Sequence, residues 1–241
     1  MPIPKTPAEF VPVEMIRGTE RQLRGQGWLP GAYNCKTAEG KILEFNIGSL
    51  PEPHDLSSAW EIQFPPNWGA PERVKIDQLI SWSEHSDPGV KYFSGTATYT
   101  KIFRLPANLY ASDLRLYLDL GKVAVIAQPK LNGQELGTLW KPPFRTEITK
   151  FLKPGENTLE IKVVNLWPNR MIGDEQLPED SERNPDGTLK AWPTWLESGQ
   201  KSSTGRYTFT TWRLWKKDSP LQQSGLIGPV KIIPAKEISI N

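Results

Sequence analysis

A strict alternation of apolar and polar residues at positions 114–120 constrains this chain more than any other feature. Leucine occupies every second position there, and a period of two places neighbouring side chains on opposite faces of a β-strand. A second β-rich run, 122–131, and a third, 134–140, flank Asn132-Gly133. Asn-Gly between two such runs is the strongest short-range hairpin signal, because both residues tolerate the positive φ of a type I′ turn. The sequence therefore predicts antiparallel β-structure at its centre.

Pro129 lies inside the second run and has no N–H to give to a ladder. We therefore expect that strand to be an edge strand or to carry a bulge. No segment shows sustained helical periodicity, and 23 Pro and 19 Gly interrupt the chain throughout. Short strands separated by turns predict an all-β protein, an antiparallel β-sandwich of the jelly-roll type. The further strands are expected at residues 28–35, 41–47, 60–64, 92–103, 158–165, 205–215 and 229–233.

Composition excludes several classes of function. The net charge of +2, with Lys and Arg scattered along the chain, argues against a nucleic-acid partner. No run has the apolar length of a membrane span, and residues 1–5 lack the apolar core of a signal peptide. The single Cys35 excludes an intramolecular disulfide and leaves the cellular compartment unassigned. His54 and His85 are too few for a histidine-rich metal site.

A long polar, turn-rich stretch at residues 166–204 holds the candidate binding residues. Trp offers a large, rigid apolar face at low entropy cost, and Arg, Asn and Asp supply directional hydrogen bonds, a combination that suits a ligand site. A Trp in a polar loop must either pack down or meet a ligand. The alternative is that the tryptophans cover the end of the sandwich, with Arg170 paired to Asp174 as an internal brace. The predicted ligand-binding residues are Trp167, Asn169, Arg170, Asp174, Trp192 and Trp195.

Other tryptophans are expected in the core, because they lie in or beside predicted strands. Trp140 stands at a strand end and suits either role. The expected core tryptophans are Trp60, Trp82, Trp212 and Trp215.

Catalytic chemistry has weaker support. Hydrolysis by a pair of carboxyl groups needs them at a set separation, which a sequence does not fix. The simpler interpretation of the acidic residues in the long stretch is a solvated surface. A Gly-x-Ser-x-Gly nucleophile elbow is absent, and residues 174–180 match no calcium-loop spacing. We therefore predict no catalytic residue and no cofactor, and leave the metal site unassigned. The carboxyl groups considered are Asp174, Glu175, Glu179, Asp180 and Glu182.

Two ordered series of short motifs resemble known families. The first resembles the sugar-binding jelly-roll domain of family 2 glycoside hydrolases, a galactose-binding-like sandwich. The second is similar to the C-terminal part of bacterial α-L-rhamnosidases of glycoside hydrolase family 106. Together they cover roughly residues 55 to 233, and Pro129 departs from the pattern. The first series is Tyr99–Phe103, Leu118–Gly121, Leu131–Gly133, Leu136-Gly137, Pro142–Phe144, Ile148-Thr149 and Pro154–Leu159; the second is Trp82–His85, Tyr92–Ala97, Asn165–Asp174 and Ser224–Val230.

The resemblance implies a jelly-roll domain over residues 54–241, with residues 1–53 as the tail of a preceding domain. Enzymes of the rhamnosidase family carry a catalytic barrel N-terminal to this sandwich, and nothing in 241 residues supplies one. The implied function is non-catalytic binding of carbohydrate, such as a rhamnose-containing oligo- or polysaccharide, or support of a catalytic domain. A scaffold without ligand and an enzyme in its own right are the alternatives. The class also implies a structural Ca²⁺, and the parent family a periplasmic or secreted location.

Overall fold

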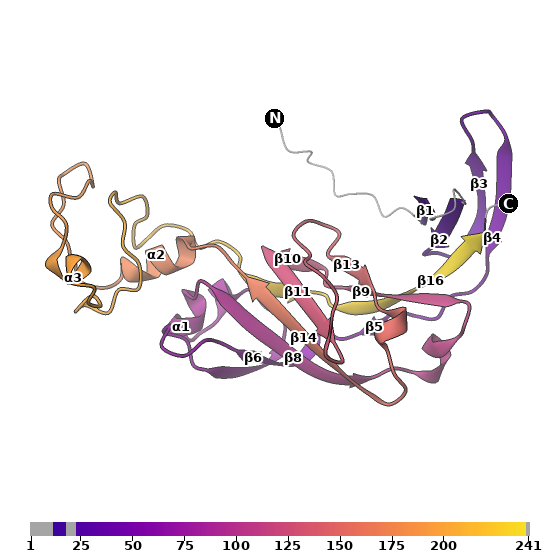
Figure 1. Cartoon of the computed structure of the whole chain (residues 1–241), viewed down its shortest axis with the longest axis horizontal. Helices are drawn as coiled ribbons and strands as arrows, with labels where there is room; N and C mark the ends of the chain where they lie inside the picture. The colour runs from indigo at the N-terminus through magenta and orange to yellow at the C-terminus, as the bar shows by residue number, and fades with distance from the viewer. Residues whose placement is uncertain (1–11, 18–22, 240–241) are drawn as a thin grey trace.

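The computed structural model describes residues 12–17 and 23–239, and two antiparallel sheets packed face to face form its body (Figure 1). The first sheet has the order β12-β11-β14-β8-β6-β7. Its strands are β6 (Ser58–Gln63), β7 (Arg73–Gln78), β8 (Thr96–Arg104), β11 (Ile126–Leu131), β12 (Gln134–Glu135) and β14 (Glu156–Val164). The antiparallel β-sandwich predicted from the alternating pattern is confirmed.

The second sheet has the order β1-β2-β16-β9-β13, and β5 also pairs with β16. A hairpin of β3 (Gly31–Lys36) and β4 (Ile42–Ile47) and a short pair of β10 (Lys122–Ala124) and β15 (Gly225–Gly228) stand beside the two main sheets. The strands of the second sheet are β1 (Val13–Arg17), β2 (Leu23–Gly27), β5 (His54–Asp55), β9 (Leu114–Asp119), β13 (Arg145–Glu147) and β16 (Lys231–Ser239).

Helical segments are short and lie between the strands. They are the 3₁₀ turns η1 (Trp82–Glu84), η2 (Ala107–Tyr110) and η3 (Thr149–Phe151), and the helices α1 (Pro88–Lys91), α2 (Pro168–Asp174) and α3 (Thr194–Glu197). In the part of the chain that the structure describes, none of them is long and apolar enough to cross a membrane.

The core follows from alternation along β8 and β14. Tyr99 lies opposite Ile161 in the ladder, and both side chains point inward and are fully buried. The ring of Trp82 stacks on that of Tyr99 with centroids 6.2 Å apart, and Trp60 meets Tyr99 edge-on at 6.1 Å. Trp60 and Trp82 are thus core residues, as predicted, and such aromatic groups contribute both buried area and geometry-dependent contacts.

The other two tryptophans expected in the core are elsewhere. Trp212 is 53% exposed and Trp215 is half-buried outside the core. The prediction failed because residues 205–215 form no strand, apart from an isolated bridge between Thr188 and Trp212. Side-chain contacts and backbone hydrogen bonds between residues 187–189 and 211–213 hold this segment, and no sheet includes it.

The central hairpin forms as predicted. Asn132 and Gly133 both have positive φ, 51° and 85°, as a type I′ turn requires. The Asn132 amide also donates to the Phe151 carbonyl at 2.8 Å and to Asn157 Oδ1 at 2.7 Å. The returning strand is shorter than expected, because only β12 and an isolated bridge between Ala127 and Leu139 pair with β11.

Pro129 lies where a missing N–H is harmless. Its carbonyl accepts from Leu136 N at 3.0 Å, so the hydrogen-bonding side of Pro129 faces the short returning arm and not β14. The pairing with β14 continues through Pro129 without a bulge. β11 lies between β12 and β14 and carries no bulge at Pro129, so the expected edge position is wrong; Pro129 is tolerated because its missing N–H faces only the short returning arm. The predicted run 122–131 is divided into β10 and β11, with a cis Ala124–Val125 peptide bond between them.

Strands from the first 53 residues extend the second sheet. β2 pairs with β16, and β1 pairs with β2. Trp28 follows directly and packs on the outer face against Tyr117 and Ala235. The guanidinium of Arg145 lies 4.3 Å from the centroid of the Trp28 ring. The domain boundary after residue 53 stays a prediction.

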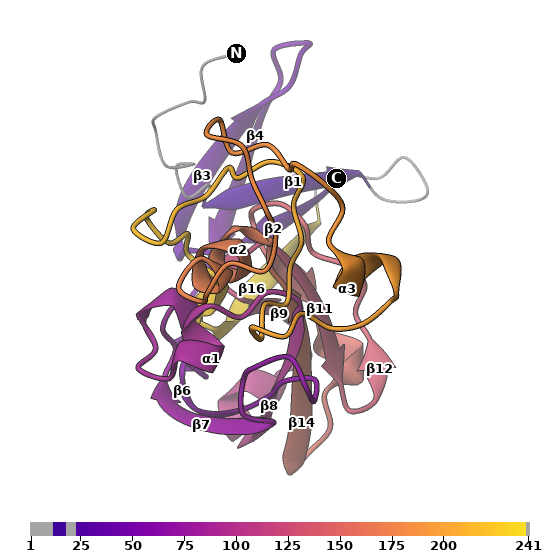
Figure 2. The ribbon, with the colours of Figure 1, turned by 90° about the vertical axis from the view of Figure 1, so that its left-hand side faces the viewer.

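Residues 165–224, here called the lobe, connect β14 to β15 and stand beyond one end of the sandwich (Figure 1). Figure 2 views the molecule from this end, with α2, α3 and their connecting loops in front. The lobe contains α2, a helix that the sequence did not predict, because seven residues are too few to show a 3.6-residue period. Pro168 at its first turn suits a helix start, where no N–H partner is needed.

Candidate functional site

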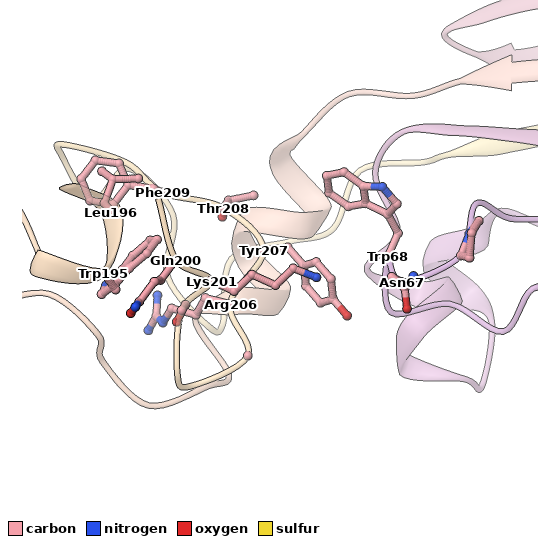
Figure 3. Close-up of a pocket in the computed structure, with 13 residues that line it drawn as sticks. Asn67, Trp68, Trp195, Leu196, Gln200, Lys201, Arg206, Tyr207, Thr208 and Phe209 are labelled. Atoms are coloured by element: carbon pink, nitrogen blue, oxygen red, sulfur yellow. The ribbon is translucent and has the colours of Figure 1, made fainter. Parts of the chain in front are cut away.

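A groove of about 620 Å³ lies between the lobe and residues 64–72, the loop that joins β6 to β7 (Figure 3). Its aromatic lining comes from both sides: Trp68 from the loop, and Trp195, Tyr207 and Phe209 from the lobe. The other lining residues are Pro66, Asn67, Leu196, Gln200, Lys201, Ser202, Gly205, Arg206 and Thr208. The two sides are far apart in sequence and are brought together only by the fold.

Trp68 and Tyr207 form an aromatic platform at one end of the groove. Their rings are stacked, with centroids 5.9 Å apart and an angle of 23° between planes. Trp167 adds a third ring, tilted, at 6.0 Å from Trp68. All three side chains are between one-third and one-half exposed. The platform therefore presents a broad apolar surface to solvent, which is unusual unless a ligand or partner covers it.

The loop that carries Trp68 is held tightly in place. Asn67 has a φ of 62° and Gly69 a φ of 89°, in the left-handed region that favours glycine. A Cβ added to Gly89, in α1, would come within 2.0 Å of the Gly69 carbonyl oxygen. The loop can approach α1 this closely because Gly89 has no side chain, and the contact fixes Trp68 on the rigid end of the sandwich.

A second aromatic group lines the other end of the groove. Phe209 meets Trp195 edge-on with centroids 6.0 Å apart, and Trp192 lies at 5.6 Å. Trp195 Nε1 donates to the Asp180 carbonyl at 3.0 Å, which fixes the indole in the lobe. Trp192 is 56% exposed, so this group also leaves apolar surface open to solvent.

Asp174 fixes the backbone that carries Tyr207. Its Oδ2 accepts from Tyr207 N at 2.9 Å, from Thr208 N at 2.7 Å and from Thr208 Oγ1 at 2.7 Å. Its Oδ1 lies 3.0 Å from Arg170 Nε in an ion pair between two buried side chains. The Arg170 guanidinium also lies 5.0 Å from the centroid of the Tyr207 ring. The brace that the sequence offered as an alternative role for Arg170 and Asp174 is present.

Two arginines neutralise the acidic residues that follow α2. Arg206 pairs with Glu175 at 3.0 Å and with Glu179 at 2.9 Å, and donates to the carbonyls of Leu177 and Pro178. Arg213 Nε lies 3.1 Å from Glu175 Oε2, and Arg213 also contacts Glu179. Salt bridges and carbonyl contacts thus occupy the Arg206 guanidinium, and both glutamates have cationic partners.

Three polar side chains of the groove have no such partners. Asn67, Gln200 and Lys201 line it and make no side-chain hydrogen bond or ion pair with any residue that the structure describes. Two amides and an ammonium group therefore remain available beside exposed aromatic rings. An amide presents both donors and an acceptor, whereas an ammonium presents donors alone.

Some of the ligand-binding residues predicted from the sequence lie at the groove, and others are buried inside the lobe. Trp195 lines the groove, and Trp167 and Trp192 contact rings that line it. Asn169 is buried and ties α2 to the segment before β15, donating to the Gln222 carbonyl at 2.7 Å and accepting from Gln222 N at 2.8 Å.

Sequence reasoning missed Trp68, Tyr207 and Phe209. Trp68 had a usable signal, since it is a large apolar residue in a loop between Pro66 and Pro71. Tyr207 and Phe209 were hidden by their assignment to a strand. Within the described residues, no group of three or more His, Cys, Asp or Glu is placed to hold a metal ion, so no described cluster supports the Ca²⁺ expected from the class.

Comparison with known proteins relates the chain to glycoside hydrolases. No protein-family model matches the sequence. A putative β-glucuronidase of Formosa agariphila is 47% identical over 203 residues, which are 84% of this chain and 17% of that protein. The solved rhamnosidase of Novosphingobium sp. PP1Y is 27% identical with a TM-score of 0.62, over 89% of this chain and 21% of that chain. A β-D-glucuronidase of Dictyoglomus thermophilum is 22% identical with a TM-score of 0.47, over 77% and 28% of the two chains.

The relatives bear out the resemblance at its coarser level. The chain is similar to a segment of glycoside hydrolases and spans about a fifth of the length of the first two. The relatives include both a rhamnosidase and a putative β-glucuronidase, so the α-L-rhamnosidase family in particular stays a prediction.

Proposed function

We propose that this chain is a non-catalytic carbohydrate-binding domain associated with a glycoside hydrolase, and that the groove beside Trp68 and Tyr207 is its binding site. The carrying observation is the combination of stacked, solvent-exposed aromatic rings with unpartnered amide groups in one groove. A volume of about 620 Å³ lies within the range of small-molecule sites. Loops at the end of a rigid sandwich commonly carry such sites.

The chemistry of a pyranose suits this lining. The C–H face of the sugar would lie on Trp68 or Tyr207, where burial of apolar area stabilises the complex. Asn67 and Gln200 would exchange hydrogen bonds with ring hydroxyls. Arg170 and Asp174 would act indirectly in this proposal, by holding the 206–208 backbone. The motifs that resemble those of family 106 rhamnosidases favour a rhamnose-containing oligo- or polysaccharide, and a periplasmic or secreted parent enzyme.

Support of a catalytic domain is the second candidate. Trp212 and Leu214 of the lobe are 53% and 59% exposed and do not line the groove. An adjoining domain would bury this surface. The two candidates are compatible, and they differ in what the isolated chain does: a scaffold binds no saccharide.

Isothermal titration calorimetry with a panel of rhamnose-containing and other plant and microbial oligosaccharides tests the proposal. We expect saturable binding that Trp68→Ala and Trp195→Ala each weaken about tenfold, the equivalent of about 1.4 kcal/mol. Trp140→Ala is the matched control, because that indole is 65% exposed but lies outside the groove. Aryl-glycoside hydrolysis is measured in parallel. A flat titration across the panel would favour the scaffold, and turnover above background would refute a non-catalytic role.

A further inference from the structure

We propose that the groove prefers sugars that carry an anionic group, a uronate carboxylate or a sulfate ester, and that Lys201 is the cation that meets this group. The inference rests on the proposed function and adds the chemical class of the ligand. It is carried by the charge of the lining and by the hydrogen-bonding partners of each charged side chain.

The groove contains free positive charge and no lining carboxylate. Lys201 and Arg206 are the charged residues among the thirteen that line it. Arg206 is neutralised by Glu175 and Glu179, which do not line the groove. Lys201 is exposed and has no ion-pair or hydrogen-bond partner among the described residues. One uncompensated cation therefore stands at the surface that the ligand would cover.

The placement of Lys201 suits an anion on a stacked sugar. Figure 3 shows its side chain extending toward Tyr207, on the side where Trp68 closes the groove. A sugar ring on this platform would bring a substituent within reach of the ammonium group. The neighbouring acids are held elsewhere, because Asp174 is buried under the backbone of Tyr207 and Thr208. An anionic substituent would thus meet a cation without a competing carboxylate in the lining.

Hydrogen-bonding character leads to the same ligand class. An ammonium group only donates, and a carboxylate or sulfate only accepts, so the two match without an unsatisfied donor. Sugar hydroxyls also donate, and the partners left for them are the amide oxygens of Asn67 and Gln200. In this arrangement the amides of Asn67 and Gln200 bind the sugar hydroxyls, and Lys201 binds the charged substituent.

Matched pairs of ligands test the inference on the whole chain. The first pair is an oligogalacturonide and its methyl ester, which differ in charge at constant length. The second pair is a sulfated galactan oligosaccharide and its desulfated form, which distinguishes sulfate from carboxylate. Binding is measured by calorimetry for the wild type, for Lys201→Gln, and for Lys216→Gln. Lys216 is an exposed lysine of the same lobe that does not line the groove.

We expect the anionic member of at least one pair to bind about threefold to fivefold more tightly, as for an exposed ion pair. The preference should disappear in Lys201→Gln, persist in Lys216→Gln, and shrink as salt is added. Equal affinity within both pairs would overturn the inference and leave the proposed function standing. A preference that survives Lys201→Gln would overturn the assignment of Lys201. Failure of all four ligands and of the neutral panel would overturn both proposals.

Discussion

Replacing Asp174 with alanine should release the floor of the groove while leaving the sandwich folded. The carboxylate accepts two backbone N–H groups and one hydroxyl, and it neutralises the buried Arg170. Removing one partner of a buried ion pair costs about 3–5 kcal/mol, because the remaining charge is left uncompensated. The freed backbone amides of Tyr207 and Thr208 add a penalty of their own.

This cost should appear as local opening of the lobe. The core cluster is built from the two sheets and the segments packed against them and contains no residue of α3 or of 205–215. It can therefore stay folded when the lobe opens, as expected for a region of lower local stability. A penalty of about 3 kcal/mol corresponds to roughly a hundredfold rise in the open population. We accordingly expect amide hydrogen exchange at Tyr207 and Thr208 to accelerate by about two orders of magnitude.

Hydrogen–deuterium exchange resolved to single amides measures this directly. Amides of β8 and β14 serve as internal references, and Asp218→Ala is the matched variant, since Asp218 is exposed and has no side-chain partner in the described part of the chain. Arg170→Met combined with Asp174→Asn should cost less than the sum of the single changes, because each single change leaves a lone buried charge and the double variant leaves none. If the amide exchange rates of Tyr207 and Thr208 in Asp174→Ala stay within about threefold of the wild-type rates, the reasoning is refuted.

Two further predictions concern the sandwich. Gly133→Ala should lower the free energy of unfolding by about 1–2 kcal/mol in urea titrations, because the φ of Gly133 is 85°. No atom lies within 4 Å of the new Cβ, so the cost is conformational alone. Gly48→Ala, without a positive φ and with only Lys236 Nζ near the new Cβ, should be neutral, and an equal loss of stability in both variants would contradict this. Burial, aided by the nearby Glu147 carboxylate, raises the pKa of Tyr117 to about 12 from its ordinary value of 10. The contribution of the neutral Tyr117 hydroxyl to stability is therefore complete below pH 10 and is lost as the pH rises toward 12. The urea midpoint should fall over this pH range, and Tyr117→Phe should flatten the fall. A tyrosinate absorbance of Tyr117 that titrates at the ordinary pKa would contradict the assignment.

The local patterns of this sequence predicted the sandwich well, for reasons visible in single residues. Leucine alternation placed β9, and Asn132-Gly133 placed the hairpin after β11, because strand faces and turn dihedrals are set by neighbouring residues. Trp60 could be assigned to the core for the same reason, whereas Trp82, assigned to the core because it lies beside a predicted strand, is buried from the 3₁₀ turn η1. Pro129 suggested an edge strand through its missing N–H, but β11 is flanked by β12, and the residue alone could not reveal that short pairing arm.

The groove could be predicted only in part. Trp195 was identified as a large apolar residue in a polar loop, and the pairing of Arg170 with Asp174 was foreseen as an alternative. Trp212 and Trp215 were misplaced, since short alternation in 205–215 resembles a strand, although side-chain contacts and a few backbone hydrogen bonds to residues 187–189 hold this segment outside any sheet. A local pattern does not reveal such contacts, which join residues about thirty positions apart.

The sequence by itself determined an antiparallel β-sandwich, its central hairpin and the concentration of aromatic residues in one long connection. Only the tertiary structure decided that Trp68 meets Tyr207, 139 positions further along the chain, and that Lys201 beside them has no partner among the residues that the structure describes. The physical reason is range. Dihedral preferences and strand faces depend on adjacent residues, whereas a binding groove depends on which distant side chains the packed sheets bring together and which of their charges remain uncompensated.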